Sequence, residues 1–102
     1  MVVDLKANEV VIKAGNTDHL HEGKKVAGKL IVTNQRIYFK TSEQKSDAFN
    51  FEVLPEQILE VIYFNTRKIF PYGLNVITKT GENLRFILKR RNEFGQLINK
   101  MY

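Results

Sequence analysis

The 102-residue sequence contains no cysteine and no long apolar stretch. Without a thiol the chain has no disulfide, no thiolate nucleophile and no cysteine ligand for zinc or an iron–sulfur cluster. No apolar run reaches the ~18–20 residues of a membrane span. Asp4 and Lys6 fall where a signal peptide would be apolar. Low-complexity segments, Pro/Gly/Ser-rich linkers and long-period repeats are also missing. These absences predict one globular domain over residues 1–102.

The charged residues are unevenly distributed along the chain. Sixteen Lys and Arg against eleven Asp and Glu give a net charge of +5. Residues 1–23 carry −2 and residues 24–45 carry +5, whereas residues 46–66 carry −4 and residues 67–102 carry +6. This alternation of acidic and basic blocks predicts a polarised surface with regions that suit an anionic partner.

Most of the chain alternates apolar and polar residues with the period of two that is typical of half-buried strands. In residues 36–40, for example, Ile37 and Phe39 face the core and the other three, Arg36 included, face outward. Seven such segments are predicted: Glu9–Lys13, Gly28–Thr33, Arg36–Lys40, Phe49–Val53, Leu59–Asn65, Leu74–Lys79 and Leu84–Lys89.

Turn-forming residues separate these segments. Asn34-Gln35 predicts a two-residue hairpin connection that makes Thr33 and Arg36 cross-strand neighbours, with Asn34 in the left-handed conformation. Thr80-Gly81 predicts a second tight turn, in which Gly81 supplies a positive φ.

Only the C-terminal residues break the period of two. Four apolar residues recur there at helical spacing, and Asn92 is the expected N-cap. The four residues are Phe94, Leu97, Ile98 and Met101. A helix of about ten residues is marginal alone, so this one must dock on the sheet. Seven strands and one closing helix predict a mainly-β fold, a small barrel or orthogonal sandwich plugged by the helix.

The segment Gly28–Phe39, with the sequence GKLIVTNQRIYF, resembles the signature hairpin of GRAM domains, which are relatives of the pleckstrin-homology fold. The order of the flanking strands and the terminal helix is similar to that family over nearly the whole chain. The resemblance implies a seven-stranded, partly open barrel with one C-terminal capping helix. Family members often carry this domain inside a larger protein, whereas we expect this chain to be a stand-alone member. The resemblance also implies a non-enzymatic binding module.

The resemblance places basic residues in and beside the loops that hold phosphoinositide headgroups in pleckstrin-like lipid binders. The candidates for lipid or anion binding are Lys24, Lys25, Lys29, Lys40, Lys45 and Lys79. Each basic residue near an anionic surface contributes roughly 1 kcal/mol of attraction. The alternating Lys/Arg pattern of lipid-binding pleckstrin domains is incomplete here. Weak attraction to anionic membranes and purely solubilising charge therefore remain alternatives to a specific phosphoinositide site.

Two further basic sites are candidates. Arg67 and Lys68 stand beside Ile69 and Phe70, and basic residues next to aromatic ones suit a membrane interface. In the alternative interpretation, Ile69 and Phe70 belong to the core. Residues 89–91 (Lys-Arg-Arg) precede the helix, where positive charge opposes the helix dipole, and a bound anion would relieve this repulsion.

A protein-interaction surface is the main competing hypothesis. Residues 59–65 are apolar on both faces, as in a strand that is central in its sheet or exposed as a docking edge. Ile62, Phe64 and Ile87 are the candidate patch for a protein partner or a homodimer. Coverage by the terminal helix or the N-terminal segment is the alternative.

No pattern predicts catalysis, a metal or a cofactor. Ser42 and Ser46 lack a nucleophile elbow. His19 and His21 fall in residues 16–25, expected to be a solvated loop without a third metal ligand. Nucleic acid is not the expected partner, because outward aromatics are few and acidic residues interrupt the basic surface. We expect a cytoplasmic module, in part peripheral at the membrane, that binds an anionic lipid headgroup or, alternatively, a protein.

Overall fold

Seven antiparallel strands and one C-terminal helix make up the computed structural model, which describes residues 5–21, 23–42, 50–66 and 70–102. The strands are β1 (Val11–His21), β2 (Lys24–Thr33), β3 (Ile37–Thr41), β4 (Phe51–Val53), β5 (Ile58–Thr66), β6 (Phe70–Thr78) and β7 (Asn83–Ile87), and the helix is α1 (Arg91–Asn99). They form one sheet in the order β4-β3-β2-β1-β7-β6-β5. The predicted fold class is confirmed.

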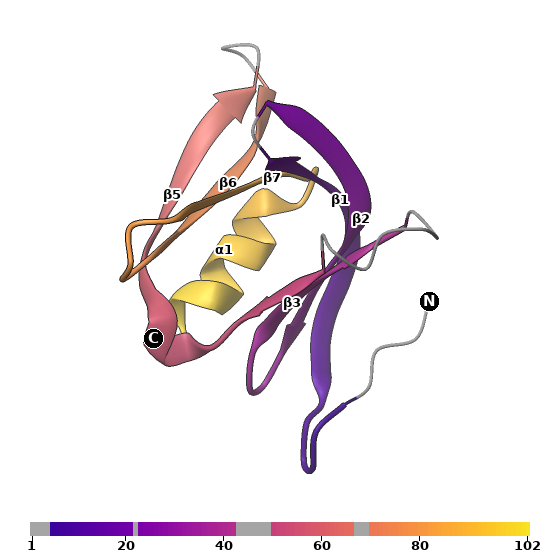
Figure 1. The fold of residues 1–102 in the computed structure, drawn as a ribbon, viewed down its shortest axis with the longest axis vertical. Helices are drawn as coiled ribbons and strands as arrows, with labels where there is room; N and C mark the ends of the chain where they lie inside the picture. The colour runs from indigo at the N-terminus through magenta and orange to yellow at the C-terminus, as the bar shows by residue number, and fades with distance from the viewer. Residues whose placement is uncertain (1–4, 22, 43–49, 67–69) are drawn as a thin grey trace.

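The sheet bends into a partly open barrel because β1 belongs to both of its halves. β1 pairs along its length with β2, but with β7 only over Asp18–Leu20. The two edge strands, β4 and β5, follow each other in the chain through the 3₁₀ turn η2 (Pro55–Gln57). Figure 1 shows α1 lying between β5 and β6 on one side and β1 and β2 on the other. In the described part of the chain no helix is long and apolar enough to cross a membrane.

The core is built by strand alternation from the sheet and by the apolar stripe of the helix. Leu30 and Val32 of β2 and Leu74 of β6 are fully buried on the inner face. Phe94 and Ile98 of α1 pack against them with 1% and 0% of their surface exposed. The predicted apolar face of the helix is therefore confirmed. The predicted N-cap is wrong: Arg90 occupies the N-cap position without a capping side-chain hydrogen bond, and the Asn92 side-chain oxygen accepts from Arg91 Nε at 2.9 Å.

Strand β1 is twice as long as expected and includes most of the segment predicted to be a solvated loop. Residues 16–21 continue β1, because the strand ends only at His21, which pairs with Lys24 of β2, and Gly23 has a φ of +81°. His19 consequently faces inward with 5% exposure, and its ring lies 5.0–5.3 Å from the rings of Phe39, Phe51 and Phe86. Burial lowers the pKa of His19. This histidine is a core residue.

The β2–β3 hairpin is closed by a side chain and not by the expected left-handed asparagine. Among the described residues, the non-glycine residue with positive φ is Asn8, at 61°. The Thr33 hydroxyl accepts from the Arg36 backbone N–H at 3.0 Å and closes the turn. Asn34 binds the N-terminal segment instead: its Oδ1 accepts from the Val10 N–H at 2.8 Å, and its Nδ2 donates to the Asn8 carbonyl at 3.0 Å. The predicted positive φ at Gly81 is confirmed, at 92°.

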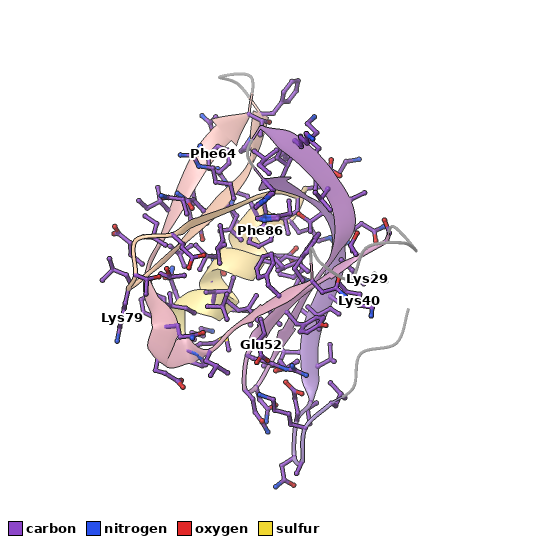
Figure 2. The ribbon with its side chains drawn as sticks, in the orientation of Figure 1. Lys29, Lys40, Glu52, Phe64, Lys79 and Phe86 are labelled. Carbon is purple, nitrogen blue, oxygen red and sulfur yellow. The ribbon has the colours of Figure 1, made fainter. Side chains whose placement is uncertain are left out.

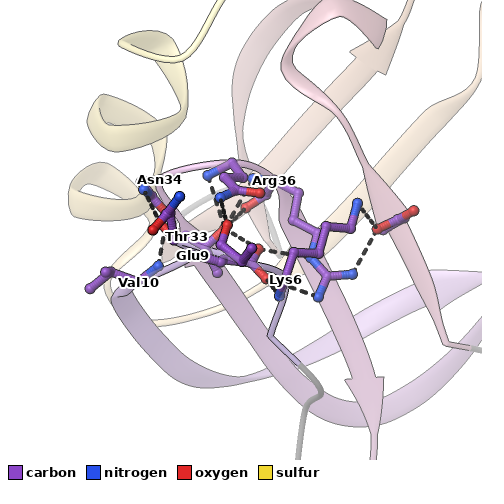
Figure 3. A network of polar contacts seen from close by, with 10 residues as sticks. Lys6, Glu9, Val10, Thr33, Asn34 and Arg36 are labelled. Atoms are coloured by element: carbon purple, nitrogen blue, oxygen red, sulfur yellow. Dashed lines mark hydrogen bonds and ion pairs between the residues drawn. The ribbon is translucent and has the colours of Figure 1, made fainter.

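Arg36 lies on the outer face of the sheet, as predicted, but the N-terminal segment buries it. Its Nε donates to Glu9 Oε2 at 2.9 Å, and its Nη1 donates to Glu52 Oε2 at 2.7 Å (Figure 3). The side chains of Arg36 and Glu9 are 7% and 0% exposed. The hydrogen bond from Arg36 lowers the pKa of Glu9 to about 2. The signature hairpin thus holds the N-terminal segment on the sheet through a buried ion pair.

Candidate functional site

The lysines predicted to form one binding site lie in three places. Lys24 and Lys25 begin β2 and are exposed beside the β1–β2 hairpin. Lys29 and Lys40 are cross-strand neighbours on the outer face of β2 and β3. Lys79 belongs to the β6–β7 hairpin, and Figure 2 shows it on the opposite side of the molecule from Lys29 and Lys40. Lys45, Arg67 and Lys68 lie outside the described residues.

Lys29 and Lys40 place two like charges side by side. They are directly paired in the β2–β3 register, so their Cβ atoms are about 4.5–5.5 Å apart. Both are half-buried, and neither forms an ion pair with any residue in the described ranges. Like charges in this arrangement repel, and a bound anion would offset the repulsion. The pair is therefore a candidate contact for an anion.

A Lys40→Glu substitution should stabilise the protein, because it converts this repulsion into a cross-strand ion pair with Lys29. We expect a gain of about 0.2–1 kcal/mol in the free energy of unfolding. Urea unfolding of the wild type and the variant measures it. Lys40→Gln, which only removes the repulsion, is the control and should gain less. An unchanged or lower unfolding midpoint for Lys40→Glu would show that the two charges do not repel.

A cleft of about 810 Å³ opens where β1 separates from β7. One wall is the stretch Ala14–Asn16 of β1, which precedes the residues paired with β7. The other wall is the β7–α1 connection with Phe94 behind it, and Ala27 and Gly28 contribute small residues to the lining. Ala14–Asn16 has no strand partner on the cleft side among the described residues, so the backbone of β1 forms no ladder hydrogen bonds with a strand there. The cleft therefore offers room beside an unpaired stretch of strand.

The cleft carries more positive than negative charge. Lys89 and Arg90 line it, and the acidic residue on its lining is Asp18. Arg90 lies 3.7 Å from Glu93, but both side chains are mostly exposed, so this contact is weak. Asn16, also on the lining, is the cross-strand neighbour of Lys29. Because neighbouring strands lie about 4.8 Å apart, Lys29 and Lys40 extend the positive charge of the cleft outward. Lys29, Lys40, Lys89 and Arg90 together are called the basic surface below.

Arg91 does not belong to this basic surface, although the sequence groups it with its two neighbours. Its Nη1 donates to the Phe64 carbonyl at 2.8 Å and to the Gly73 carbonyl at 3.3 Å. Its guanidinium lies 4.8 Å from the centre of the Tyr63 ring. Arg91 therefore anchors the beginning of α1 to β5 and β6.

The second cavity, of about 470 Å³, lies between β4 and the β6–β7 hairpin and has the opposite character. Lys79 lines it together with Glu52, Glu56 and Glu82. Three carboxylates around one ammonium group disfavour a phosphate. The structure therefore separates Lys79 from the basic surface.

The predicted interaction patch lies on the outer face of β5 and β7. Phe64 and Ile87 flank Gly73 in one cross-strand row, and the Phe64 ring occupies the space that a Cβ at Gly73 would need. Ile62 is 43% exposed on the same face. Its neighbour Asn75 is buried, with an Oδ1 that has no hydrogen-bond partner among the described residues. The structure therefore brings the three predicted apolar residues to one face of the sheet.

The bent seven-stranded sheet closed by a C-terminal helix is a pleckstrin-homology-like fold. It is similar to the C-terminal domain of an unknown protein from Leishmania infantum, with a TM-score of 0.77 and 18% identity over 93% of this chain and 86% of that one. The Vps36 N-terminal PH domain gives a TM-score of 0.71 and 13% identity over 95% and 84% of the two chains. The Slm1 PH domain, described with its ligand in the non-canonical site, gives 0.62 and 13% over 89% and 94%.

Within this class the chain belongs to the GRAM domain family, whose model matches residues 2–102. The Slm1 PH domain is also similar in its complex with inositol-4-phosphate, with a TM-score of 0.58 and 16% identity over 89% and 92% of the chains. No curated protein matches the chain. At these identities the similar structures show the fold alone.

Proposed function

We propose that the chain is a non-enzymatic module that binds phosphate-bearing anionic headgroups at a membrane surface, through the basic surface formed by Lys29, Lys40, Lys89 and Arg90. The observation that carries this proposal is the Lys29–Lys40 pair, which is half-buried, unpaired with any described acid and next to a cleft edged by two more cations. When a multivalent anion lies between two cations that repel each other in the free protein, it attracts both of them and also offsets their repulsion. Such a pair therefore contributes more to the free energy of anion binding than two isolated cations.

Two further observations support this proposal. The cavity between β4 and the β6–β7 hairpin is rich in carboxylates, which argues against an anion there. The Slm1 PH domain, whose fold is similar, is described as binding its ligand in the non-canonical site, and it has been solved with inositol-4-phosphate. An inositol phosphate has the charge that the basic surface requires. On this proposal the protein is peripheral at the membrane.

The Lys29→Glu/Lys40→Glu double variant should lose at least about thirtyfold in affinity for anionic vesicles, since each basic residue near such a surface is worth roughly 1 kcal/mol. Co-sedimentation with phosphatidylcholine vesicles, with and without phosphatidylinositol phosphate, measures this loss. Binding of the wild type should need the anionic lipid and fall with added salt. Soluble inositol phosphate should compete if one headgroup is recognised.

Lys79→Glu/Lys100→Glu is the matched control, because it changes the net charge equally at two exposed positions away from the basic surface. We expect this control variant to lose less than about threefold in affinity for anionic vesicles. Equal losses in the two variants would mean that only the overall charge matters. Failure of the wild type to sediment with any vesicle would overturn the proposal.

A second candidate function is docking of a protein on the outer face of β5–β7. The observation that favours it is the exposed Ile62 beside the unpartnered acceptor of Asn75. Light scattering across a concentration series, with Ile62→Arg as the variant, tests whether this face holds a second copy of the chain. A monomer at every concentration would leave a heterologous partner as the form of this candidate.

A further inference from the structure

We propose that Phe70 and Tyr72 form an aromatic anchor that enters the headgroup–acyl boundary of an anionic bilayer and orients the end of the barrel that carries the cleft toward the membrane. This inference rests on the proposed function and goes beyond it, because it specifies which surface contacts the lipid and how.

The two rings form one preorganised unit. Phe70 and Tyr72 are two residues apart in β6, at a point where the register with β5 shifts by one residue, and their rings lie together. Their ring centroids lie 5.8 Å apart with an angle of 7° between the planes. Pro71 between them fixes its own φ, which limits the freedom of the backbone. A rigid pair of this kind loses little conformational entropy on entering an interface.

The pair extends past the part of β6 that the helix covers. Leu74 and Val76, on the same face of β6, are buried in the core. Arg91 holds the beginning of α1 at the level of Phe64 and Gly73 through their carbonyl oxygens. Residues 70–72 lie before this point in the strand, so α1 does not cover them. Phe70 is accordingly 40% exposed, and the register of β6 with β5 shifts between Gly73 and Phe70.

The charges beside the pair specify the partner. Tyr72 lines the cleft together with Lys89 and Arg90. Its carbonyl oxygen also accepts from the Leu88 N–H at 2.9 Å, which places the aromatic pair next to the two cations. An exposed aromatic pair beside an excess of positive charge matches the interface of an anionic bilayer, where rings lie at the headgroup level and cations contact phosphates. A neutral apolar protein surface would offer no anion to Lys89, and it would leave Arg90 with its weak, exposed contact to Glu93.

The sequence contains no tryptophan, so Phe70→Trp introduces a unique fluorophore at the proposed point of insertion. With phosphatidylcholine vesicles that contain phosphatidylinositol phosphate, we expect a blue shift of its emission and quenching by lipids brominated near the headgroup. Leu59→Trp is the control. Leu59 is 54% exposed and lies at the opposite end of β5, about 23 Å from the end that pairs with Phe70. Its emission should not change.

Phe70→Ala should weaken vesicle binding about tenfold, whereas Leu59→Ala should not. Binding of soluble inositol phosphate by Phe70→Ala should stay within about twofold of the wild type, because the cations are intact. If the Phe70→Trp variant sediments with vesicles but its emission does not shift, the anchor is overturned and the proposed function still stands. A blue shift that depends on protein concentration without vesicles would assign the pair to self-association. If the wild type does not bind vesicles, both proposals fail together.

Discussion

Replacing Arg36 with methionine should destabilise the protein by about 3–5 kcal/mol at neutral pH, the loss expected when one partner of a buried ion pair is removed. The Glu9 side chain is fully buried, and Arg36 binds both of its oxygens, at 2.9 and 3.1 Å. In the variant, the Glu9 carboxylate would keep only its bonds from Thr33 and the Lys6 backbone. The free energy of unfolding of a domain is typically about 5–15 kcal/mol, so this loss would be a large fraction of the total stability. Urea unfolding measures the loss.

The pH dependence identifies the mechanism of this loss. Arg36 lowers the pKa of Glu9 from 4.5 to about 2, so the ion pair stabilises the wild type above pH 4.5 and this contribution fades as the pH falls toward 2. The difference in the free energy of unfolding between the wild type and Arg36→Met should therefore become smaller as the pH falls from 4.5 to 2. The double variant Glu9→Gln/Arg36→Met, which buries no uncompensated charge, should be more stable than Arg36→Met at pH 7. If this difference in the free energy of unfolding did not change with pH, the loss would come from poor packing of the methionine side chain and not from the lost ion pair.

The sequence predicted the class of fold because the apolar pattern of the strands is local. Alternation identified all seven strands, and the i, i+3, i+4, i+7 spacing of the helix placed Phe94 and Ile98 correctly in the core. The second half of β1 was missed because its polar residues resemble a loop. Those residues form a strand since Asp18–Leu20 pair with β2 on one side and with β7 on the other. That second pairing joins segments almost seventy residues apart.

The same long-range pairing explains why the binding surface could be predicted only in part. Alternation placed Lys40 on the outer face of its strand, and the local β2–β3 hairpin brings Lys29 beside it. No local sequence pattern indicates that Lys89 and Arg90 lie opposite β1 across the cleft. The cleft forms only where β1 separates from β7, and these strands are far apart in the sequence. The burial of Arg36 likewise depends on the N-terminal segment folding back over the outer face. The period-two alternation of a strand predicts which face of the sheet a side chain lies on. It does not predict which other segment of the chain packs over that face.

Phe94→Ala should cost about 3 kcal/mol, the lower end of the range for a buried phenylalanine. The ring is 1% exposed and joins α1 to β1, where a Cβ built on Gly15 would meet it at 3.2 Å. The loss stays at the lower end because the ring borders the 810 Å³ cleft, so water can fill the space that it leaves. Thermal or urea unfolding followed by circular dichroism measures the change.

The neighbouring glycine supplies the control for this prediction. In the wild type, Gly15→Ala should be neutral or slightly destabilising, because the new methyl group crowds the Phe94 ring. In the Phe94→Ala background the same change should stabilise by about 0.5–1 kcal/mol, since alanine is favoured over glycine in a strand and the space is then free. This reversal of sign in a double-mutant cycle measures the contact itself. Purely additive effects would mean that α1 does not depend on Phe94 to dock against β1, and that the other apolar residues of the helix hold it on the sheet.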